Sequence, residues 1–402
     1  MDLIVLDTIH GGLDIARALS SFGYKADAVD VYRGSLDPGP DLHYDQVVAP
    51  VHLDPDNTIF RLVKDLPLIT HHEATGWIIG SSRPTPMIEI TGARGKTTTA
   101  FAIAHLFTSP GILHTSCGTF RYPDRKILWK KSITPASLIA VAEYPGAREG
   151  WLVAEVSLGV TGAGDIAVLT SSEDYPCAGG KKSALALKLS SMAHSPLLIA
   201  APGVHADHPQ IVHVEDHVRI EGSRCYFHLN GISGSFENTL LGLPAYAGPL
   251  MTAAATGCML GISPEPLSTF PAIPGRMAVS RENGHLVVDN ANSGTVAKTT
   301  EDAADYAKVL SGGKGFILVI GQESRAVCEG FPPAEIAGVI NDSRPSIVYL
   351  VGTRGEYDAV RSSVNEGQGC EVVHVPVFED ARRAAMERND GLPVVLAVKS
   401  WR

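Results

Sequence analysis

Residues 87–98 have the sequence MIEITGARGKTT, and this stretch decides the fold. The apolar run over 87–91 predicts a buried strand, and residues 96–107 are predicted to form a helix. A glycine-rich turn between a strand and a helix lets backbone N–H groups surround phosphates, and the positive end of the helix dipole adds to the attraction. The pattern therefore favours a phosphate-binding loop for a nucleotide such as ATP over a chance glycine-rich turn.

Two side chains of this loop have expected roles. Lys96 is expected to reach the outer phosphates, and the Thr97 hydroxyl is expected to bind Mg²⁺. The residues predicted to bind the nucleotide here are Thr91, Gly92, Ala93, Arg94, Gly95, Lys96, Thr97 and Thr98.

Outside the loop, short apolar runs alternate with helical patterns, which is typical of α/β layers with a mostly parallel sheet. The 402 residues suffice for several domains. We predict three: an N-terminal Rossmann-like substrate domain over 1–84, a central phosphate-loop ATP-binding domain over 85–273 and a C-terminal Rossmann-like domain over 274–402. Early elements are expected as a strand over 3–6, a helix over 13–22, a strand over 28–32 and, later, a hairpin over 277–290.

Bulk composition limits the partners. A net charge of −10 disfavours general nucleic-acid binding, which needs a basic face. No two of the six cysteines have the C-x-x-C spacing, so neither a zinc ribbon nor a disulfide framework is predicted. The N-terminus lacks a basic signal region, and Gly, Pro and Thr interrupt the apolar stretch 246–262, which favours a buried helix over a membrane span. We expect a cytoplasmic protein without membrane contact.

Further motifs follow the loop in a consistent order. The general phosphate-loop pattern has Gly where this chain has Ile90. The form T-G-x-x-G-K-T-T after an apolar residue resembles the Mur ligase superfamily, which includes the muramyl-peptide and folylpolyglutamate synthetases. Similar elements are Gly118-Thr119, Thr134-Pro135, Glu155-Val156-Ser157, Thr170 to Asp174, Lys188, Gly275-Arg276-Met277 and Asp289.

The resemblance implies an ATP-dependent ligase that converts a carboxylate into an acyl phosphate for attack by a nucleophile. It implies that Lys96, Glu155 and Lys188 are catalytic. Thr97, Glu155 and a carbamylated Lys188 are implied to bind one or two Mg²⁺ ions. The residue types alone also allow an ion-paired Glu155 at a strand end and a solvated helix lysine at 188.

Two residues of the last third are implied to contact the nucleotide, Arg276 and Asp289. A guanidinium suits phosphate or adenosine contact. A surface ion pair and a turn aspartate are the respective alternatives.

Several departures separate this chain from the cell-wall enzymes of the superfamily. Tyr175 replaces a metal-binding His, Ala245-Tyr246-Ala247 replaces an H-N pair, and the first block is too short for a UDP-sugar domain. A narrower resemblance is to the coenzyme F-430 synthases, and it rests on LDTIHGG at 6–12, VDVY at 29–32, Arg94 and the short chain.

That resemblance implies a nickel seco-tetrapyrrole acid as the substrate. ATP would phosphorylate one propionate side chain, and a ring carbon would attack the acyl phosphate to close a carbocyclic ring, with release of ADP and phosphate. Nickel would arrive within the substrate and would need no protein ligand.

Two regions are predicted to contact this substrate. His10, Gly11 and Gly12 follow a strand, and α/β sheets bind ligands at the carboxyl ends of strands. Arg125 and Lys126 belong to a basic run with aromatic residues that suits a polycarboxylate macrocycle. A tight turn and a solvated hairpin are the alternatives.

Two other functions stay open. One is a Mur-like amide ligase that acts on another carboxylate. The other, from a different class, is a nucleotide-dependent regulatory ATPase, which would hydrolyse ATP slowly whatever acid is present.

Overall fold

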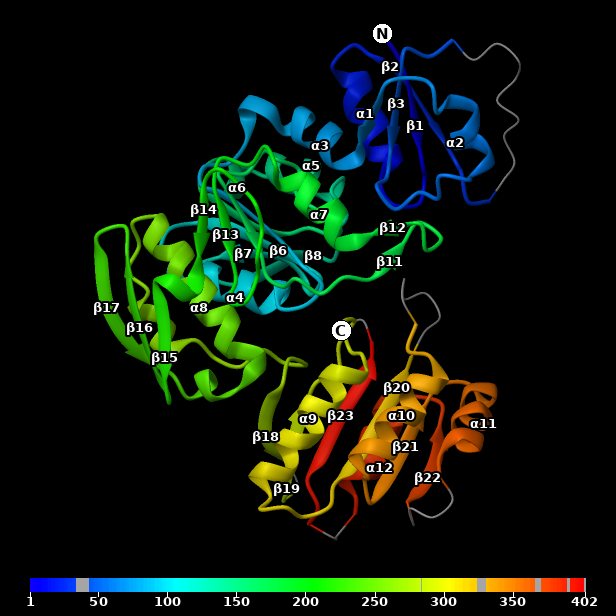
Figure 1. Ribbon diagram of the computed structural model, residues 1–402, viewed down its shortest axis with the longest axis vertical. Helices are drawn as coiled ribbons and strands as arrows, with labels where there is room; N and C mark the ends of the chain where they lie inside the picture. Colours follow the sequence, from blue (N-terminus) through cyan, green and yellow to red (C-terminus); the bar gives the residue numbers. More distant parts are fainter. Residues whose placement is uncertain (34–42, 283, 324–329, 366–369, 389–390, 401–402) are drawn as a thin grey trace. The chain divides into compact units, whose positions relative to one another are not determined.

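The computed structural model describes residues 1–33, 43–282, 284–323, 330–365, 370–388 and 391–400 (Figure 1). Contacts divide the chain into two compact units, Met1–Phe270 and Pro271–Arg402. Both units consist of sheets covered by helices, as the alternating apolar pattern predicts.

The first unit begins with a parallel sheet in the order β2-β1-β3-β4. The chain runs from β1 to β2 on one side, whereas β3 lies on the other side of β1. The sheet therefore has a switch point between β1 and β3, where ligands bind in open α/β sheets. Its elements are β1 (Asp2–Leu6), α1 (Gly12–Ser21), β2 (Lys25–Val29), β3 (Gln46–Ala49), α2 (Thr58–Val63), β4 (Leu68–Thr70), α3 (His71–Ile79) and η1 (Gly80–Ser82).

Strand β1 is buried because helices cover both of its faces. Leu3 and Val5 pack with residues of α1 and α3, whereas Ile4 and Leu6 pack with residues of α2. The next strand, β2, begins three residues before the predicted 28–32 and ends at Val29, so Tyr32 lies in the loop beyond it.

The central sheet has the order β14-β13-β10-β5-β9-β6-β7-β8. It is parallel from β14 to β6, and the antiparallel strands β7 and β8 extend it. Its strands are β5 (Met87–Thr91), β6 (Gly111–Thr115), β7 (Gly118–Tyr122), β8 (Lys126–Trp129), β9 (Trp151–Glu155), β10 (Ile166–Leu169), β13 (Leu198–Ala200) and β14 (Ile211–His213).

Helices and two smaller sheets complete the first unit. The antiparallel sheet β15-β16-β17 lies in a region for which no strand is predicted from the sequence. The remaining elements are α4 (Lys96–Leu106), α5 (Ser137–Glu143), α6 (Pro145–Arg148), β11 (Pro176–Cys177), β12 (Lys182–Ser183), α7 (Ala184–Met192), η2 (Val214–Asp216), β15 (Val218–Glu221), β16 (Arg224–Leu229), β17 (Ile232–Glu237), η3 (Thr239–Gly242), α8 (Pro244–Met259) and η4 (Glu265–Thr269).

The second unit has one six-stranded sheet in the order β18-β19-β23-β20-β21-β22. The predicted hairpin is present as β18 and β19, and the other neighbours are parallel. Its elements are β18 (Ala278–Glu282), β19 (His285–Asp289), α9 (Ala297–Leu310), β20 (Ile317–Gln322), α10 (Pro333–Ser343), β21 (Ile347–Val351), α11 (Arg354–Ser363), β22 (Glu371–Val375), α12 (Phe378–Met386) and β23 (Val394–Lys399).

Among the described residues, no helix is long and apolar enough to cross a membrane. Most of the apolar stretch 246–262 lies in α8, a helix of 16 residues whose inner positions are buried. The predicted domain boundaries near residues 84 and 273 stay predictions.

Candidate active site

The predicted phosphate loop lies between β5 and α4, in the strand–loop–helix context that such a loop requires. Gly95 has φ 80° and Gly92 has φ 150°, conformations that L side chains rarely adopt. A Cβ atom on Gly92 would lie 2.2 Å from the Thr170 hydroxyl oxygen. The backbone therefore needs glycine at both positions.

Residues at the end of the neighbouring strand β10 hold the loop in place. The Thr170 hydroxyl donates to the Arg94 carbonyl at 2.6 Å. The Ser171 hydroxyl oxygen accepts from the N–H groups of Ala93 at 2.9 Å and Arg94 at 3.2 Å. The Arg94 side chain also forms an ion pair with Glu173. These contacts fix the loop through a strand that is distant in sequence.

Glu155, at the end of β9, joins the loop to the first turn of α4. Its side chain is 3% exposed, and one carboxylate oxygen accepts from the Thr97 hydroxyl at 2.8 Å and from the Ser116 N–H at 3.1 Å. The other carboxylate oxygen lies 3.9 Å from the Lys96 ammonium, which also donates to the Gly92 carbonyl at 3.0 Å. The structure thus brings Lys96, Thr97 and Glu155 together.

This arrangement fits a divalent cation. Mg²⁺ takes oxygen ligands, usually one or two carboxylates together with substrate phosphates. The Glu155 carboxylate and the Thr97 hydroxyl are such ligands, and they lie beside a loop shaped for phosphates.

Lys188 lies on α7 and is 1% exposed. Its ammonium lies 4.5 Å from the centre of the Tyr175 ring, a cation–π contact. The alternative of a solvated helix lysine is therefore wrong. On the same helix, the Ser191 hydroxyl oxygen accepts from the Val160 N–H at 2.9 Å, so α7 contacts the segment that follows β9.

Arg276 and Asp289 belong to the second unit. Arg276 precedes β18, and Asp289 ends β19, where its carboxylate accepts from the Ala291 N–H at 3.1 Å. Asp289 pairs with Ala278 in the register of the hairpin. Their contact with a nucleotide stays a prediction.

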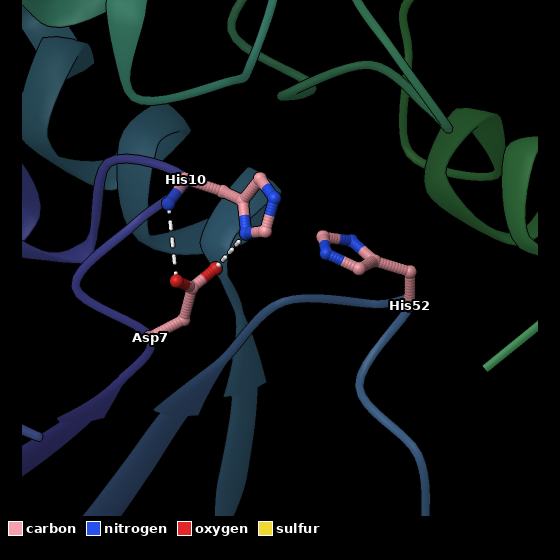
Figure 2. A group of neighbouring side chains, drawn as sticks. All are labelled: Asp7, His10 and His52. Atoms are coloured by element: carbon pink, nitrogen blue, oxygen red, sulfur yellow. Dashed lines mark hydrogen bonds and ion pairs between the residues drawn. The ribbon is translucent and has the colours of Figure 1, made fainter. Parts of the chain in front are cut away.

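The second predicted region, at the end of β1, is built around a buried carboxylate. Asp7 is fully buried, and one of its oxygens accepts from the N–H groups of Ile9 at 2.7 Å and His10 at 3.0 Å. The other oxygen lies 2.7 Å from Nδ1 of His10. Figure 2 shows this double contact and His52 opposite the His10 ring.

Two further side chains face His10. The His52 ring, from the segment after β3, meets the His10 ring edge-on with 4.9 Å between ring centres. The Tyr32 hydroxyl lies 3.2 Å from Nε2 of His52, and the Tyr32 ring is 5.4 Å from that of His10. Residues from the segments that follow β1, β2 and β3 thus meet at the switch point of the sheet.

Electrostatics distinguish the two histidines. The hydrogen bond to Asp7 raises the pKa of His10 against the opposing effect of burial. Burial alone would raise the pKa of Asp7, but hydrogen bonds from His10 and Ile9 outweigh it and lower this pKa. Burial lowers the pKa of His52 to about 4, so His52 is neutral near pH 7.

Glycine is required at positions 11 and 12 because other atoms of the protein approach the backbone closely there. A Cβ atom on Gly12 would lie 1.8 Å from the Asp7 carbonyl oxygen. Gly11 has φ 103°, and its Cβ would lie 2.4 Å from Cβ of Ala136 and 3.6 Å from the Thr134 hydroxyl oxygen. The turn after β1 therefore lies against the segment that begins α5.

Arg125 and Lys126 lie elsewhere. They are at the turn between β7 and β8, and Arg125 donates to Nδ1 of His105 near the end of α4. Because α4 begins at the phosphate loop, this turn lies at the opposite edge of the sheet. Lys130 and Lys131 follow β8 and return to the edge where β6 ends.

Sequence reasoning did not select Asp7, Tyr32 or His52 as site residues. Asp7 and Tyr32 occur in the motifs LDTIHGG and VDVY, so a signal was present. No motif in the sequence pointed to His52, because its position beside His10 depends on the pairing of β3 with β1.

Comparison with known proteins agrees with this architecture. The chain resembles MurF from Acinetobacter baumannii with a TM-score of 0.58 and 14% identity over 88% of this chain and 82% of that one. It resembles E. coli FolC in complex with ADP with a TM-score of 0.57 and 14% identity over 87% and 96% of the two chains. These similarities confirm the predicted Mur-ligase fold.

The narrower resemblance is also confirmed. Residues 279–400 match the family described as "Coenzyme F430 synthetase CfbE, C-terminal domain". The chain is 29% identical to the coenzyme F(430) synthetase of Methanosarcina acetivorans, over 91% of this chain and 93% of that protein. It is 23% identical to that of Methanocaldococcus jannaschii, over 84% and 87% of the two chains.

Proposed function

We propose that this ligase activates a propionate side chain of a nickel seco-tetrapyrrole as an acyl phosphate and closes a carbocyclic ring to give coenzyme F430, ADP and phosphate. The observation that carries the ligase chemistry is the buried carboxylate of Glu155 between Lys96 and Thr97. The substrate class rests on the similarity to two coenzyme F(430) synthetases.

Phosphoryl transfer needs positioning and neutralisation of charge more than covalent help from the protein. The backbone N–H groups of the loop and the helix end would hold the phosphates, and the Lys96 ammonium would neutralise the outer ones. Thr97 and Glu155 would hold Mg²⁺, which when bound neutralises charge that develops on the transferred phosphoryl group.

Three further residues complete the proposed nucleotide and metal site. A carbamylated Lys188 would supply an anionic ligand for a second Mg²⁺, and its burial is compatible with such a role. Arg276 and Asp289 would contact the nucleotide. Closure around ATP would exclude water, which would otherwise hydrolyse the acyl phosphate.

We place the tetrapyrrole at the carboxyl edge of the N-terminal sheet, against the turn of His10, Gly11 and Gly12. Arg125 and Lys126 are not included, because they lie at the edge away from the phosphate loop. The exposed ammonium groups of Lys130 and Lys131 are better placed to pair with the substrate's carboxylates.

The test is ADP release from ATP and Mg²⁺ with a panel of acids that includes the nickel seco-tetrapyrrole, with its visible spectrum followed in parallel. Stoichiometric ADP release and a new chromophore for that acid alone would support the proposal. ADP release that requires a different acid and an amine would show that the protein is an amide ligase and would contradict the proposed ring closure. Slow release that is indifferent to every acid would favour the regulatory ATPase.

A further inference from the structure

We propose that His10, held in orientation by Asp7, is the general base that removes the proton from the attacking ring carbon. This inference rests on the proposed function, because only carbon–carbon bond formation requires a base that acts on a C–H bond. An amine nucleophile attacks with a free electron pair, whereas a carbon nucleophile must lose its proton before or during attack.

The geometry defines which atom of His10 is basic. An ionised carboxylate only accepts hydrogen bonds, so at the 2.7 Å contact Nδ1 of His10 must donate to Asp7. Nε2 then carries the free electron pair. The Asp7 side chain is fully buried, whereas that of His10 is 30% exposed, so a substrate can reach the ring but not the carboxylate. Asp7 is thus a positioning residue, and His10 would touch the substrate.

The backbone of Asp7 supports a functional interpretation. Asp7 has φ 85°, in the left-handed region that a non-glycine residue adopts only at a cost in conformational free energy. Such conformations persist where the surrounding structure maintains them, and they are frequent at active sites. Here the conformation is stabilised by hydrogen bonds from Ile9 and His10 to the Asp7 carboxylate.

The charges around His10 favour its role as a general base. Asp7 stabilises the imidazolium that forms, and its hydrogen bond raises the pKa of His10. The facing side chains, His52 and Tyr32, are neutral near pH 7, because burial lowers the pKa of His52 to about 4 and raises that of Tyr32. The other groups that act electrostatically on His52 include His72, which is also neutral, and the Lys182 ammonium.

The base and the phosphate site are connected through packed segments of the first unit. Gly11 lies against Ala136, close to Thr134. In the same segment, the Ile133 carbonyl accepts from the N–H of Ser157, two residues after Glu155. A substrate seated on this segment would have His10 on one side and the metal-binding carboxylate on the other.

Asp7 and His10 are better placed to share a proton in a hydrogen bond than to bind a metal ion together. Asp7, His10 and His52 each offer an atom within 4.8 Å of the others. However, the Asp7 and His10 atoms are 2.7 Å apart, a hydrogen-bond distance. Neighbouring ligand atoms around tetrahedral zinc are about 3.3 Å apart, given Zn–ligand distances of about 2.0–2.1 Å.

The proposed step balances without an oxidant or a reductant. The carbon's proton moves to Nε2 of His10, and the electron pair of the C–H bond forms the bond to the acyl carbon. The bond from the acyl carbon to the phosphate oxygen breaks, and its electron pair leaves with inorganic phosphate. The imidazolium then returns its proton to water.

The test separates activation from ring closure in the full-length enzyme with ATP, Mg²⁺ and the nickel seco-tetrapyrrole. Activation is measured as hydroxamate formed with hydroxylamine, and closure by the visible spectrum. In His10→Gln we expect hydroxamate formation within about threefold of the unaltered enzyme, whereas closure falls by about 10²–10⁴-fold, the usual contribution of a general base. His194→Gln, at an exposed turn after α7, is the matched control and should change neither rate.

Two further variants distinguish a base from a structural role. In His10→Ala, added imidazole should restore closure without altering hydroxamate formation. In Asp7→Asn, the acid limb of the pH profile of closure should move to lower pH, because the carboxylate no longer raises the pKa of His10. Asn is a suitable replacement because it tolerates positive φ better than most residues.

Each outcome has a distinct meaning. If the His10→Gln variant closes the ring at the rate of the unaltered enzyme, His10 is not the general base, whereas the proposed function stays intact. Equal loss of hydroxamate and closure, without imidazole rescue, would also overturn it and make His10 a binding residue. If the unaltered enzyme forms neither ADP nor hydroxamate with this acid, the proposed function fails and the base fails with it.

Discussion

The Thr97 hydroxyl donates a hydrogen bond to the Glu155 carboxylate across 2.8 Å, and this contact joins residues 58 positions apart in the sequence. Thr97 belongs to the first turn of α4, and Glu155 ends β9. Because β5 and β9 are parallel neighbours, their carboxyl ends share an edge of the sheet. The groups that we propose to bind the metal ion and the phosphates therefore meet through sheet topology.

Replacement of Lys96 by Ala should greatly reduce turnover while the protein stays folded. The ammonium is expected to neutralise the outer phosphates, and loss of one such charge-stabilising group typically costs about 10²–10³-fold in rate. Acid-dependent ADP release measures the effect, and the exposed Lys64→Ala is the control. Unchanged turnover would contradict the phosphate-loop assignment.

Replacement of Glu155 by Gln should raise the Mg²⁺ concentration needed for half-maximal activity. Gln keeps the volume and the acceptor for Thr97 but removes the charge, and a loss of about 1.4 kcal/mol already weakens binding about tenfold. The measurement is ADP release as a function of Mg²⁺. An unaltered Mg²⁺ dependence would leave Glu155 as a structural hydrogen-bond acceptor only.

Replacement of Lys188 by Ala should strongly reduce turnover, and bicarbonate or acetate should restore part of it by supplying the missing carboxylate. Lys188→Met, which keeps an apolar stem in this buried position, controls for packing and should be equally impaired. Intact-mass measurement of the native protein tests for the carbamate itself. Normal ATP chemistry in both variants would exclude the carbamate ligand.

Replacement of Gly12 by Ala should lower the free energy of unfolding by about 1–3 kcal/mol, the usual cost of an added methyl group in a packed site. The new Cβ would lie 1.8 Å from the Asp7 carbonyl oxygen, which must move. Urea unfolding measures the change. Gly242→Ala, where a Cβ meets nothing within 4 Å, should leave the stability nearly unaltered, and equal effects at both positions would refute the close approach.

Stability should fall as the pH is lowered from about 6.5 to about 4. Burial lowers the pKa of His52, His71, His72 and His114 to about 4, so over this range the unfolded chain binds more protons than the folded one. Each histidine contributes a slope of up to about 1.4 kcal/mol per pH unit. The raised pKa of His10 has the opposite sign, since its stabilisation is present at low pH and lost as pH rises through that pKa.

Urea unfolding at several pH values measures this slope. His114→Gln removes one of the four groups and should reduce the slope by about one proton. A slope that is unaltered in this variant, or stability that is flat between pH 6.5 and 4, would contradict the neutral burial of these side chains.

Local sequence determined the predicted phosphate loop, since Gly92, Gly95, Lys96 and Thr97 lie within residues 92–97 and their spacing alone specifies the turn and the start of α4. It likewise determined the layered α/β architecture, because apolar runs of strand length alternate with helical patterns. The hairpin of the second unit follows from short-range signals around residue 284 in the same way.

Tertiary structure alone decided how distant segments combine. His52 faces His10 only because β3 pairs with β1, and Arg125 lies away from the loop only because β7 runs antiparallel to β6. Strand order and direction depend on how buried faces pack across the whole sheet, and no short window of sequence contains that information. The sequence therefore determined which residue types are available for the proposed chemistry. The packing of the sheets decided which of these residues lie close together.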